Sequence, residues 1–234
     1  IISFKEAVDD AQQNKIDILI TAPINKDLSY SNTFKFSGHT DYLKNNFNSD
    51  PMMLMVSDNL KLGLLTEHIP IKDVIKSITQ KKVINKIKIL RKTLIKDFLI
   101  KEPKIAILAI NPHAGDNGVI GKEDQEILVP AIDQINHDKN LIFGPFSADT
   151  FFCNENFKKY DGVIAAYHDQ GLIPFKTISF GNGVNYSAGL PIIRTSPDHG
   201  TGFDIAGKGI ASPSSFIQAL KLGLKIYKSR NTIV

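Results

Sequence analysis

The chain has 234 residues, of which 42% are hydrophobic and 22% charged, a composition typical of a globular protein and unlike that of a disordered, collagen-like or coiled-coil chain. Its net charge of +4 comes with no basic–aromatic pattern, and no apolar run approaches the roughly 20 residues that cross a bilayer, so we expect neither nucleic-acid nor membrane binding. The single cysteine, Cys153, excludes a disulfide within the chain and favours a cytoplasmic location.

Hydrophobic periodicity predicts alternating helices and strands along the chain. In chain order, we expect a helix at 3–14, a strand at 16–20, a helix at 41–47, strands at 52–56 and 60–65, a basic amphipathic helix at 81–101, a strand at 104–110, a helix at 121–137, strands at 141–143 and 162–166, and a helix at 212–227. Segments 181–185 and 193–196 are expected to be loops. Strands that alternate with helices predict an α/β fold with a mostly parallel sheet.

The glycines match none of the common phosphate-binding or serine-hydrolase motifs. The patterns G-x-G-x-x-G, G-x-x-x-x-G-K-[ST] and G-x-S-x-G are all absent from the sequence. The sequence therefore gives no support to the usual dinucleotide-binding fold, to a P-loop or to the nucleophile elbow of serine hydrolases.

Three of the six histidines follow the carboxyl ends of expected strands. His68 follows the strand at 60–65, His113 the strand at 104–110 and His168 the strand at 162–166. In an open α/β sheet, ligands bind outside these strand ends. Three imidazoles at one such edge are a typical ligand set for a divalent metal that keeps open positions for substrate. We therefore predict a metal site here, the alternative being that these histidines are ordinary loop or capping residues.

A second group of polar segments has the chemistry of an anion-binding site. Segments 21–26 and 37–40 supply hydroxyl, imidazole and helix-start N–H groups. Asn185 and Arg194 add an amide and a guanidinium, and Lys176 follows His168 closely enough to reach the same pocket. Each group alone is equally typical of turns and surface charge, but together they predict a small anionic substrate beside the metal.

Several short motifs together resemble the 4-hydroxythreonine-4-phosphate dehydrogenase family of vitamin B6 biosynthesis. They are, in family order, TAPINK at 21–26, GHT at 38–40, NPHAG at 111–115, ADT at 148–150, YHDQG at 167–171 and GLPIIRTS at 189–196. The stretch DHGTGFDIAGKG at 198–209 is similar to the adenosine-binding loop of isocitrate and isopropylmalate dehydrogenases. The resemblance implies the isocitrate/isopropylmalate dehydrogenase-like α/β fold, with a mostly parallel sheet, helices on both faces and two lobes flanking a cleft.

The resemblance also implies roles for individual residues. The divalent metal, which would be zinc, magnesium or cobalt, would be held by His68, His113 and His168. The substrate would be bound by His39, Thr40, Lys176, Asn185 and Arg194. Catalytic roles, including proton transfer, would fall to Asp149, Asp169 and Lys176. The cofactor NAD, or NADP in its place, would be bound through His199, Gly200, Thr201 and Asp204.

The activity that the resemblance implies is NAD-dependent oxidation and decarboxylation of 4-phosphohydroxy-L-threonine to 3-amino-2-oxopropyl phosphate, a step of pyridoxal phosphate biosynthesis. A metal on the secondary alcohol would lower its pKa while hydride leaves for the nicotinamide, and would then take up the enolate charge as carbon dioxide departs. Members of the family are homodimers in which each metal site is completed across the interface, so the three histidines need not come from one chain.

Family members also carry a further N-terminal segment that has no counterpart in this sequence. We therefore expect residues 1–22 with 160–234 to be the remnant of a cofactor-side lobe, and residues 23–159 to be a metal and dimerisation lobe. Three alternatives stay open. They are a dehydrogenase of a related substrate such as threonate or erythronate 4-phosphate, a metal-dependent hydrolase or phosphatase, and a truncated remnant that binds ligand without catalysis.

Overall fold

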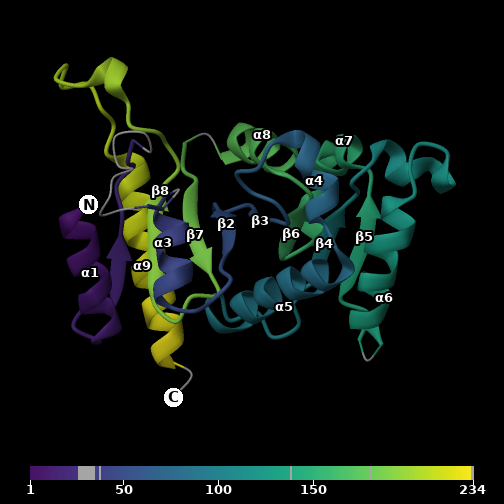
Figure 1. The fold of residues 1–234 in the computed structure, drawn as a ribbon, viewed down its shortest axis with the longest axis horizontal. Coiled ribbons are helices and arrows are strands. Elements are labelled where there is room, and N and C mark those ends of the chain that lie inside the picture. The colour runs from purple at the N-terminus through teal and green to yellow at the C-terminus, as the bar shows by residue number, and fades with distance from the viewer. Residues whose placement is uncertain (26–34, 37, 138, 180, 233–234) are drawn as a thin grey trace. The chain divides into compact units, whose positions relative to one another are not determined.

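The computed structural model describes residues 1–25, 35–36, 38–137, 139–179 and 181–232 (Figure 1). Lys26 and Ser37, which belong to the predicted anion-binding segments, lie outside these residues. The chain forms two compact units: unit 1 consists of Ile1–Pro51 with Gly181–Val234, and unit 2 of Met52–Phe180. The two lobes expected from the sequence have the same nested order with other boundaries, and their cofactor and metal roles stay predictions.

Unit 1 is built around strand β8. Its described elements are α1 (Ile2–Gln12), β1 (Ile18–Ile20), α3 (His39–Asn46), β7 (Val184–Ala188), β8 (Ile193–Pro197), the short turn of helix η4 (Phe203–Ile205) and α9 (Ser214–Thr232). Strand β1 runs parallel to β8 with Leu19 opposite Arg194, and β7 runs antiparallel to it with Tyr186 opposite Thr195.

Alternate residues of β8 point to two different layers of unit 1. A hydrophobic cluster on one side joins β1 to α1 and α3, and its buried members are Val8, Leu19, Tyr42, Leu43 and Leu190. On the other side lies α9, where a Cβ on Gly223 would be 2.8 Å from Ile18 Cγ2. The buried Thr195 hydroxyl donates to the Ala219 carbonyl of α9 (2.9 Å). Arg194, the neighbour of Thr195 on β8, therefore faces the layer of α1 and α3.

Unit 2 contains a mixed sheet with the strand order β2-β3-β6-β4-β5. Its elements are β2 (Met52–Val56), β3 (Lys61–Leu64), α4 (Ile71–Ser77), α5 (Gln80–Lys96), β4 (Ile105–Leu108), η1 (Pro112–Gly118), η2 (Asp124–Leu128), α6 (Val129–Asn136), β5 (Ile142–Phe146), α7 (Ala148–Phe151), η3 (Cys153–Lys159), β6 (Gly162–Ala165) and α8 (His168–Ser179). Strands β3, β6, β4 and β5 are parallel, and β2 is antiparallel to β3. The predicted α/β fold with a mostly parallel sheet is thus confirmed.

Helices cover both faces of the unit 2 sheet, which explains the continuous apolar runs of its strands. Helix α8 lies against one face, where a Cβ on Gly171 would be 2.5 Å from Leu62 Cδ2. Helix α5 lies against the other, where a Cβ on Gly162 would be 3.0 Å from Leu94 Cδ1. Within the described residues, the helices are too short or too polar to span a bilayer.

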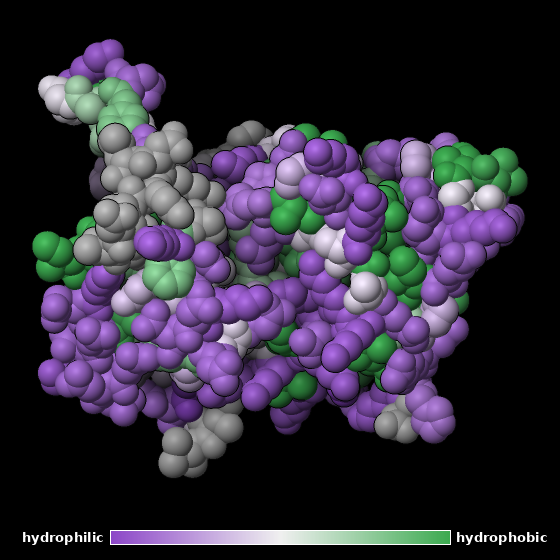
Figure 2. Space-filling view, in the orientation of Figure 1, coloured by the Kyte–Doolittle hydropathy of each residue, from purple (hydrophilic) through white to green (hydrophobic). Residues whose placement is uncertain are grey.

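Helix α5 has the amphipathic character that the sequence predicts. Its buried apolar residues are Val83, Ile87, Leu90 and Leu94. The visible surface over α5 is mostly hydrophilic (Figure 2). Lys86, which falls between the apolar positions, is nevertheless 5% exposed. The helix begins after Thr79, whose hydroxyl accepts from the Lys82 N–H (3.3 Å), and ends at Lys96 rather than at residue 101.

Several regions differ from the expected elements. Residues 181–185 and 193–196 were expected to be loops, but Val184–Ala188 and Ile193–Pro197 are strands. Helix α8 is absent from the expectation because Gly171 and Pro174 disfavour a helix in its sequence. The expected helix at 121–137 consists of the π-type turn η2 followed by α6, and the closing helix begins at Ser214 and extends to Thr232.

Candidate active site

The carboxyl ends of three adjacent parallel strands carry the histidines that the sequence analysis selects. Strand β6 lies between β3 and β4 in the sheet. His168 begins α8 just after β6, His68 follows β3, and His113 follows β4 within η1. The fold therefore brings segments that are far apart in the sequence to one edge of the unit 2 sheet.

Two of these histidines lie close together and line the same cavity. The ring centroids of His68 and His168 are 5.5 Å apart with an interplanar angle of 45°. Two imidazoles bound to one tetrahedral metal at about 2 Å have centroids about 5 Å apart, so the separation of this pair is close to that of two ligands of one metal. Both rings line a cavity of about 290 Å³ together with Glu67, Tyr167 and Asp169.

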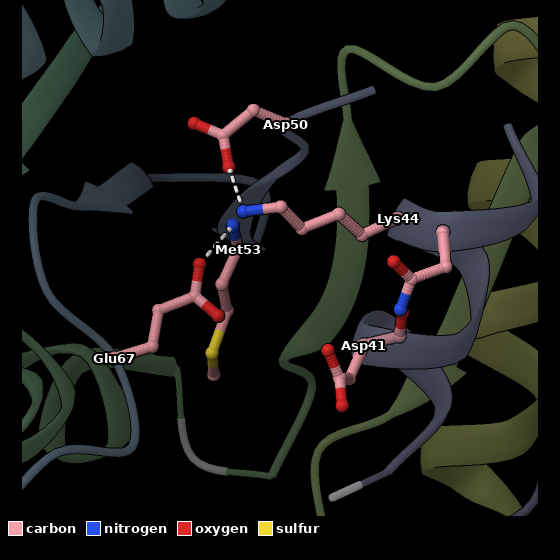
Figure 3. Close-up of polar contacts among 6 residues, drawn as sticks. Asp41, Lys44, Asp50, Met53 and Glu67 are labelled. Atoms are coloured by element: carbon pink, nitrogen blue, oxygen red, sulfur yellow. Dashed lines mark hydrogen bonds and ion pairs between the residues drawn. The ribbon is translucent and has the colours of Figure 1, made fainter. Parts of the chain in front are cut away.

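Carboxylates next to each histidine in the sequence make hydrogen bonds in this region. Asp169 Oδ1 lies 2.7 Å from His168 Nδ1, an arrangement that fixes the ring and leaves Nε2 as the donor atom for a metal. Glu67, the residue before His68, accepts a hydrogen bond from the Met53 N–H of β2 (3.0 Å), as Figure 3 shows. The start of the His68 loop is thereby attached to the sheet.

His113 is placed differently. It is exposed and lies in a turn whose residues have left-handed backbone angles, with φ of 52° at His113, 53° at Ala114 and 43° at Asp116. Among the described residues, no group of three His, Cys, Asp or Glu side chains has the geometry of a metal site. One chain therefore brings together His68 and His168 but not the complete predicted set.

The two predicted catalytic aspartates lie on one cavity of about 470 Å³ in unit 2. Asp149 comes from the first turn of α7, and Asp169 comes from the first turn of α8. Asp169 lines both this cavity and the one beside His68 and His168. Lys176 is exposed on α8, and the Cys153 thiol beyond α7 lies 3.8 Å from the Asp149 carbonyl oxygen.

Arg194 of β8 is the centre of a second polar cluster, in unit 1. Its guanidinium is 3% exposed and donates to Thr21 Oγ1 (2.6 Å from Nη2 and 3.1 Å from Nε) and to Ser187 Oγ (3.2 Å). His39 Nδ1 lies 3.5 Å from Arg194 Nη2. Because these partners are neutral groups, the positive charge is desolvated without a carboxylate beside it among the described residues, which favours the binding of an anion.

The electrostatics of the cluster agree with this interpretation. Burial lowers the pKa of Arg194 to about 10, so the guanidinium keeps its charge at neutral pH. Burial and the nearby Arg194 lower the pKa of His39 to about 4, so the imidazole stays neutral. The ring of Phe4 packs edge-on against His39, with centroids 4.5 Å apart.

Two of the remaining predicted substrate residues, Thr40 and Asn185, belong to unit 1. Thr40 follows His39 in the first turn of α3. Asn185 lies two positions before Ser187 on β7, and alternation along a strand places both side chains on one face. Of the five predicted substrate residues, His39 and Arg194 are in contact range, and Lys176 belongs to unit 2.

The predicted cofactor residues lie in the segment between β8 and α9, which extends from unit 1 as a long loop (Figure 1). His199, Gly200, Thr201 and Asp204 are all exposed. His199 Nδ1 is 2.8 Å from the Gly200 carbonyl oxygen, and Asp204 lies within η4. The structure thus keeps these residues together on one accessible loop.

Sequence reasoning did not single out several residues that build these clusters. Ser187 contacts Arg194, but a single serine beyond the loop expected at 181–185 carries no signal of that role. Gln170 and Asp124 make hydrogen bonds to the strand ends near the histidines. Asp124 falls within the helix expected at 121–137, where an acidic residue would normally face solvent, whereas its side chain is fully buried. These residues are distinguished by contacts with distant segments, which the sequence does not reveal.

Fold and site together define an α/β protein of the isocitrate dehydrogenase type. It has a histidine edge, formed by His68, His113 and His168 at the carboxyl ends of β3, β4 and β6. The structure of isocitrate dehydrogenase from Methylococcus capsulatus has a TM-score of 0.56 at 14% identity, over 96% of this chain and 71% of that chain, which confirms the predicted fold. The profile of the family described as "Pyridoxal phosphate biosynthetic protein PdxA" matches residues 1–223. The chain therefore belongs to this family, as its motifs predict.

Two relatives illustrate the similarity. The chain is 43% identical to a 4-hydroxythreonine-4-phosphate dehydrogenase of Bacteroides thetaiotaomicron over 231 residues, which cover 97% of this chain and 63% of that protein. The crystal structure of 4-hydroxythreonine-4-phosphate dehydrogenase from Klebsiella pneumoniae has a TM-score of 0.81 at 33% identity, over 97% of this chain and 68% of that chain. The chain thus spans about two thirds of the length of these relatives.

Proposed function

We propose that this chain works as an NAD-dependent 4-hydroxythreonine-4-phosphate dehydrogenase, which oxidises and decarboxylates 4-phosphohydroxy-L-threonine to 3-amino-2-oxopropyl phosphate in pyridoxal phosphate biosynthesis. Its relatives carry the name of that enzyme. The observation that carries the proposal is the pair of His68 and His168, whose rings are 5.5 Å apart at the carboxyl ends of adjacent parallel strands. This is where an α/β sheet binds its ligands.

The buried guanidinium of Arg194 supplies binding energy for an anionic group of the substrate. It retains its charge, its present partners are neutral, and its planar donors match a phosphate or carboxylate. Neutral His39 and the hydroxyl of Thr40 add hydrogen bonds beside it. Binding the substrate at an end remote from the reacting carbon orients that carbon for reaction.

His68 and His168 would hold a divalent metal, with Asp169 fixing the ring of His168. A metal held there would supply Lewis acidity to the alcohol of the substrate, and a bound nicotinamide would supply the hydride acceptor. Asp149 and Asp169, which line one cavity, accept and return the protons released during oxidation and decarboxylation. The exposed loop with His199 and Asp204 binds the cofactor.

We further infer a cytoplasmic homodimer with a site shared between its protomers. His113 is exposed in a fixed turn and does not join His68 and His168 within the described part of one chain. A site that takes His113 from the partner would complete the set of three imidazoles, and a two-fold dimer would contain two such sites.

The proposal is tested by measuring nicotinamide reduction with 4-phosphohydroxy-L-threonine, first in the presence of Zn²⁺, Mg²⁺ or Co²⁺ and then after treatment with a chelator. We expect reduction of NAD with release of carbon dioxide, its loss on chelation and its return with added metal. A panel with threonate and erythronate 4-phosphates defines the substrate. Absence of NAD or NADP reduction with every member of the panel would contradict the proposal, and metal-dependent release of phosphate without a nicotinamide would replace it by a hydrolase.

A further inference from the structure

We propose that Asp124 and Gln170 are positioning residues, which hold the His113 turn in place relative to β6, the strand that precedes His168. The inference rests on the proposed metal role of these two histidines. It concerns the backbone between β4 and His113. Asp124 of η2 and Gln170 of α8 both make hydrogen bonds to this backbone.

The backbone conformation of the His113 turn is unfavourable for most of its residues. Residues 113–117 all have positive φ, and of these only Gly115 lacks a Cβ. Left-handed angles at His113, Ala114, Asp116 and Asn117 are unfavourable for residues with side chains, and such conformations persist only where the surroundings impose them. Something outside the turn must therefore hold it.

Asp124 fixes the entry to the turn. Its carboxylate, which is fully buried, accepts hydrogen bonds from the N–H groups of Ile110 (2.7 Å) and Asn111 (3.0 Å). The Asn111 side-chain amide donates to Asp124 Oδ2 (3.0 Å) and to Glu123 Oε2 (2.8 Å). A buried carboxylate holds the N–H groups that donate to it strongly, because water does not compete for these hydrogen bonds.

Gln170 makes a hydrogen bond to the same segment one residue earlier, at Ala109. Its amide nitrogen donates to the Ala109 carbonyl (2.7 Å), and its amide oxygen accepts from the Ala166 N–H (2.7 Å). Ala109 lies at the end of β4 and Ala166 at the end of β6, so one carboxamide joins the two strand ends. His168 lies two residues after Ala166, and His113 lies four residues after Ala109.

The exit of the turn is closed by the same group of residues. The Ile120 N–H donates to the Gly115 carbonyl (3.0 Å) across the turn. A Cβ on Gly121 would lie 2.7 Å from Asn111 Nδ2, so the chain returns directly over the amide that Asp124 holds. The entry is thus hydrogen-bonded to Asp124, and the exit packs against the Asn111 amide that donates to Asp124.

The first test uses Asp124→Asn, which keeps the shape of the side chain and removes its charge and one acceptor. We expect Zn²⁺ affinity, measured by calorimetric titration, to fall about ten- to hundredfold, as for other residues that orient metal ligands. Amide hydrogen exchange at Ile110 and Asn111 should accelerate, while the amides of β2 and β3 stay protected. The control is Asp133→Asn on α6, where the same change is made at an exposed position.

The second test uses Gln170→Glu, which retains an acceptor for the Ala166 N–H but places a carboxylate oxygen against the Ala109 carbonyl. We expect the same loss of Zn²⁺ affinity, together with a lower kcat at an unchanged KM for substrate. Unaltered affinity and exchange in both variants, or a uniform loss of protection throughout unit 2, would overturn the positioning role, as would a parent protein that binds no divalent metal. A parent that binds metal without reducing a nicotinamide would contradict the proposed function alone.

Discussion

Arg194 Nη2 donates to Thr21 Oγ1 over 2.6 Å, although the two residues are 173 positions apart in the sequence. The contact depends on the parallel pairing of β1 with β8, which places the end of β1 beside the arginine. Ser187 reaches the same guanidinium from the antiparallel strand β7. The neighbours of β8 on either side, β1 through Thr21 and β7 through Ser187, thus supply neutral partners for the buried cation that β8 carries.

Replacing Arg194 by Lys should weaken substrate binding while preserving the charge. Lysine cannot reproduce the planar fork of donors, so we expect KM for the phosphorylated substrate to rise about ten- to hundredfold. Initial rates over a range of substrate concentrations measure this change. Lys225→Met, on the exposed face of α9, removes a positive charge elsewhere in unit 1 and should leave KM as it is. An unaltered KM in Arg194→Lys would argue against an anion at this position.

The stability of unit 1 should depend on pH through His39. Burial and Arg194 lower the pKa of His39 from 6.5 to about 4. Between pH 6.5 and pH 4, His39 is therefore protonated in the unfolded chain and neutral in the folded chain. The stability that the neutral imidazole contributes is therefore complete above pH 6.5 and is lost as the pH falls toward 4. The loss is on the order of 3 kcal/mol.

Urea unfolding at several pH values, with the parent and His39→Gln compared at each, measures this contribution. Other groups also titrate in this range, but the difference between the two proteins isolates His39. We expect the difference to shrink as the pH falls from 6.5 to 4. Two curves that stay parallel over that range would show that His39 is protonated as readily in the folded chain as in the unfolded one.

The shared site predicts complementation between inactive variants. His113→Ala and His168→Ala should each abolish activity. If one protomer supplies His113 and the other supplies His68 and His168, a mixed dimer regains one intact site, and an equal mixture regains roughly a quarter of the parent activity. The mixture is prepared by unfolding and refolding the two variants together. If all three histidines act within one protomer, no activity returns.

Gly171 is predicted to be required for the packing of α8 on the sheet. A Cβ at this position would lie 2.5 Å from Leu62 Cδ2 and 3.0 Å from Ala165 Cβ, both in the core. We expect Gly171→Ala to lower the free energy of unfolding by about 1–3 kcal/mol, the usual range for overpacking. Thermal unfolding measures the change.

Gly200→Ala is the matched control, because a Cβ at Gly200 meets nothing within 4 Å. Its midpoint of thermal unfolding should equal that of the parent. If Gly171→Ala unfolds at the same temperature as this control, the contact between α8 and β3 is looser than the structure indicates.

The sequence predicts the histidine edge because its signals are local. An apolar run of four or five residues followed by a histidine appears three times, and such runs indicate buried parallel strands. The positions of β3, β4 and β6 follow from those runs, and their adjacency makes His68 and His168 neighbours. Motif resemblance predicts the family for a similar reason, since each motif is short and contiguous.

The parts that escape prediction depend on contacts between distant segments. Strand β8 contains Arg194, Thr195 and Ser196, whose polarity indicates a loop, and only the partners supplied by β1, β7 and α9 make it a buried strand. Helix α8 contains Gly171 and Pro174, and the packing that compensates for the glycine lies on β3. The left-handed His113 turn has a single glycine, so its conformation is set by Asp124 rather than by its own residues.

The single thiol of the chain allows a fluorescent label to be attached at one position. Cys153 is exposed, and its sulfur lies against the carbonyl oxygen of Asp149, a residue that lines the larger cavity of unit 2. A maleimide fluorophore would therefore attach at one known position without any cysteine having to be removed first. Its emission would change when a ligand displaces water near Asp149, which turns the unaltered chain into a sensor for binding that does not depend on turnover.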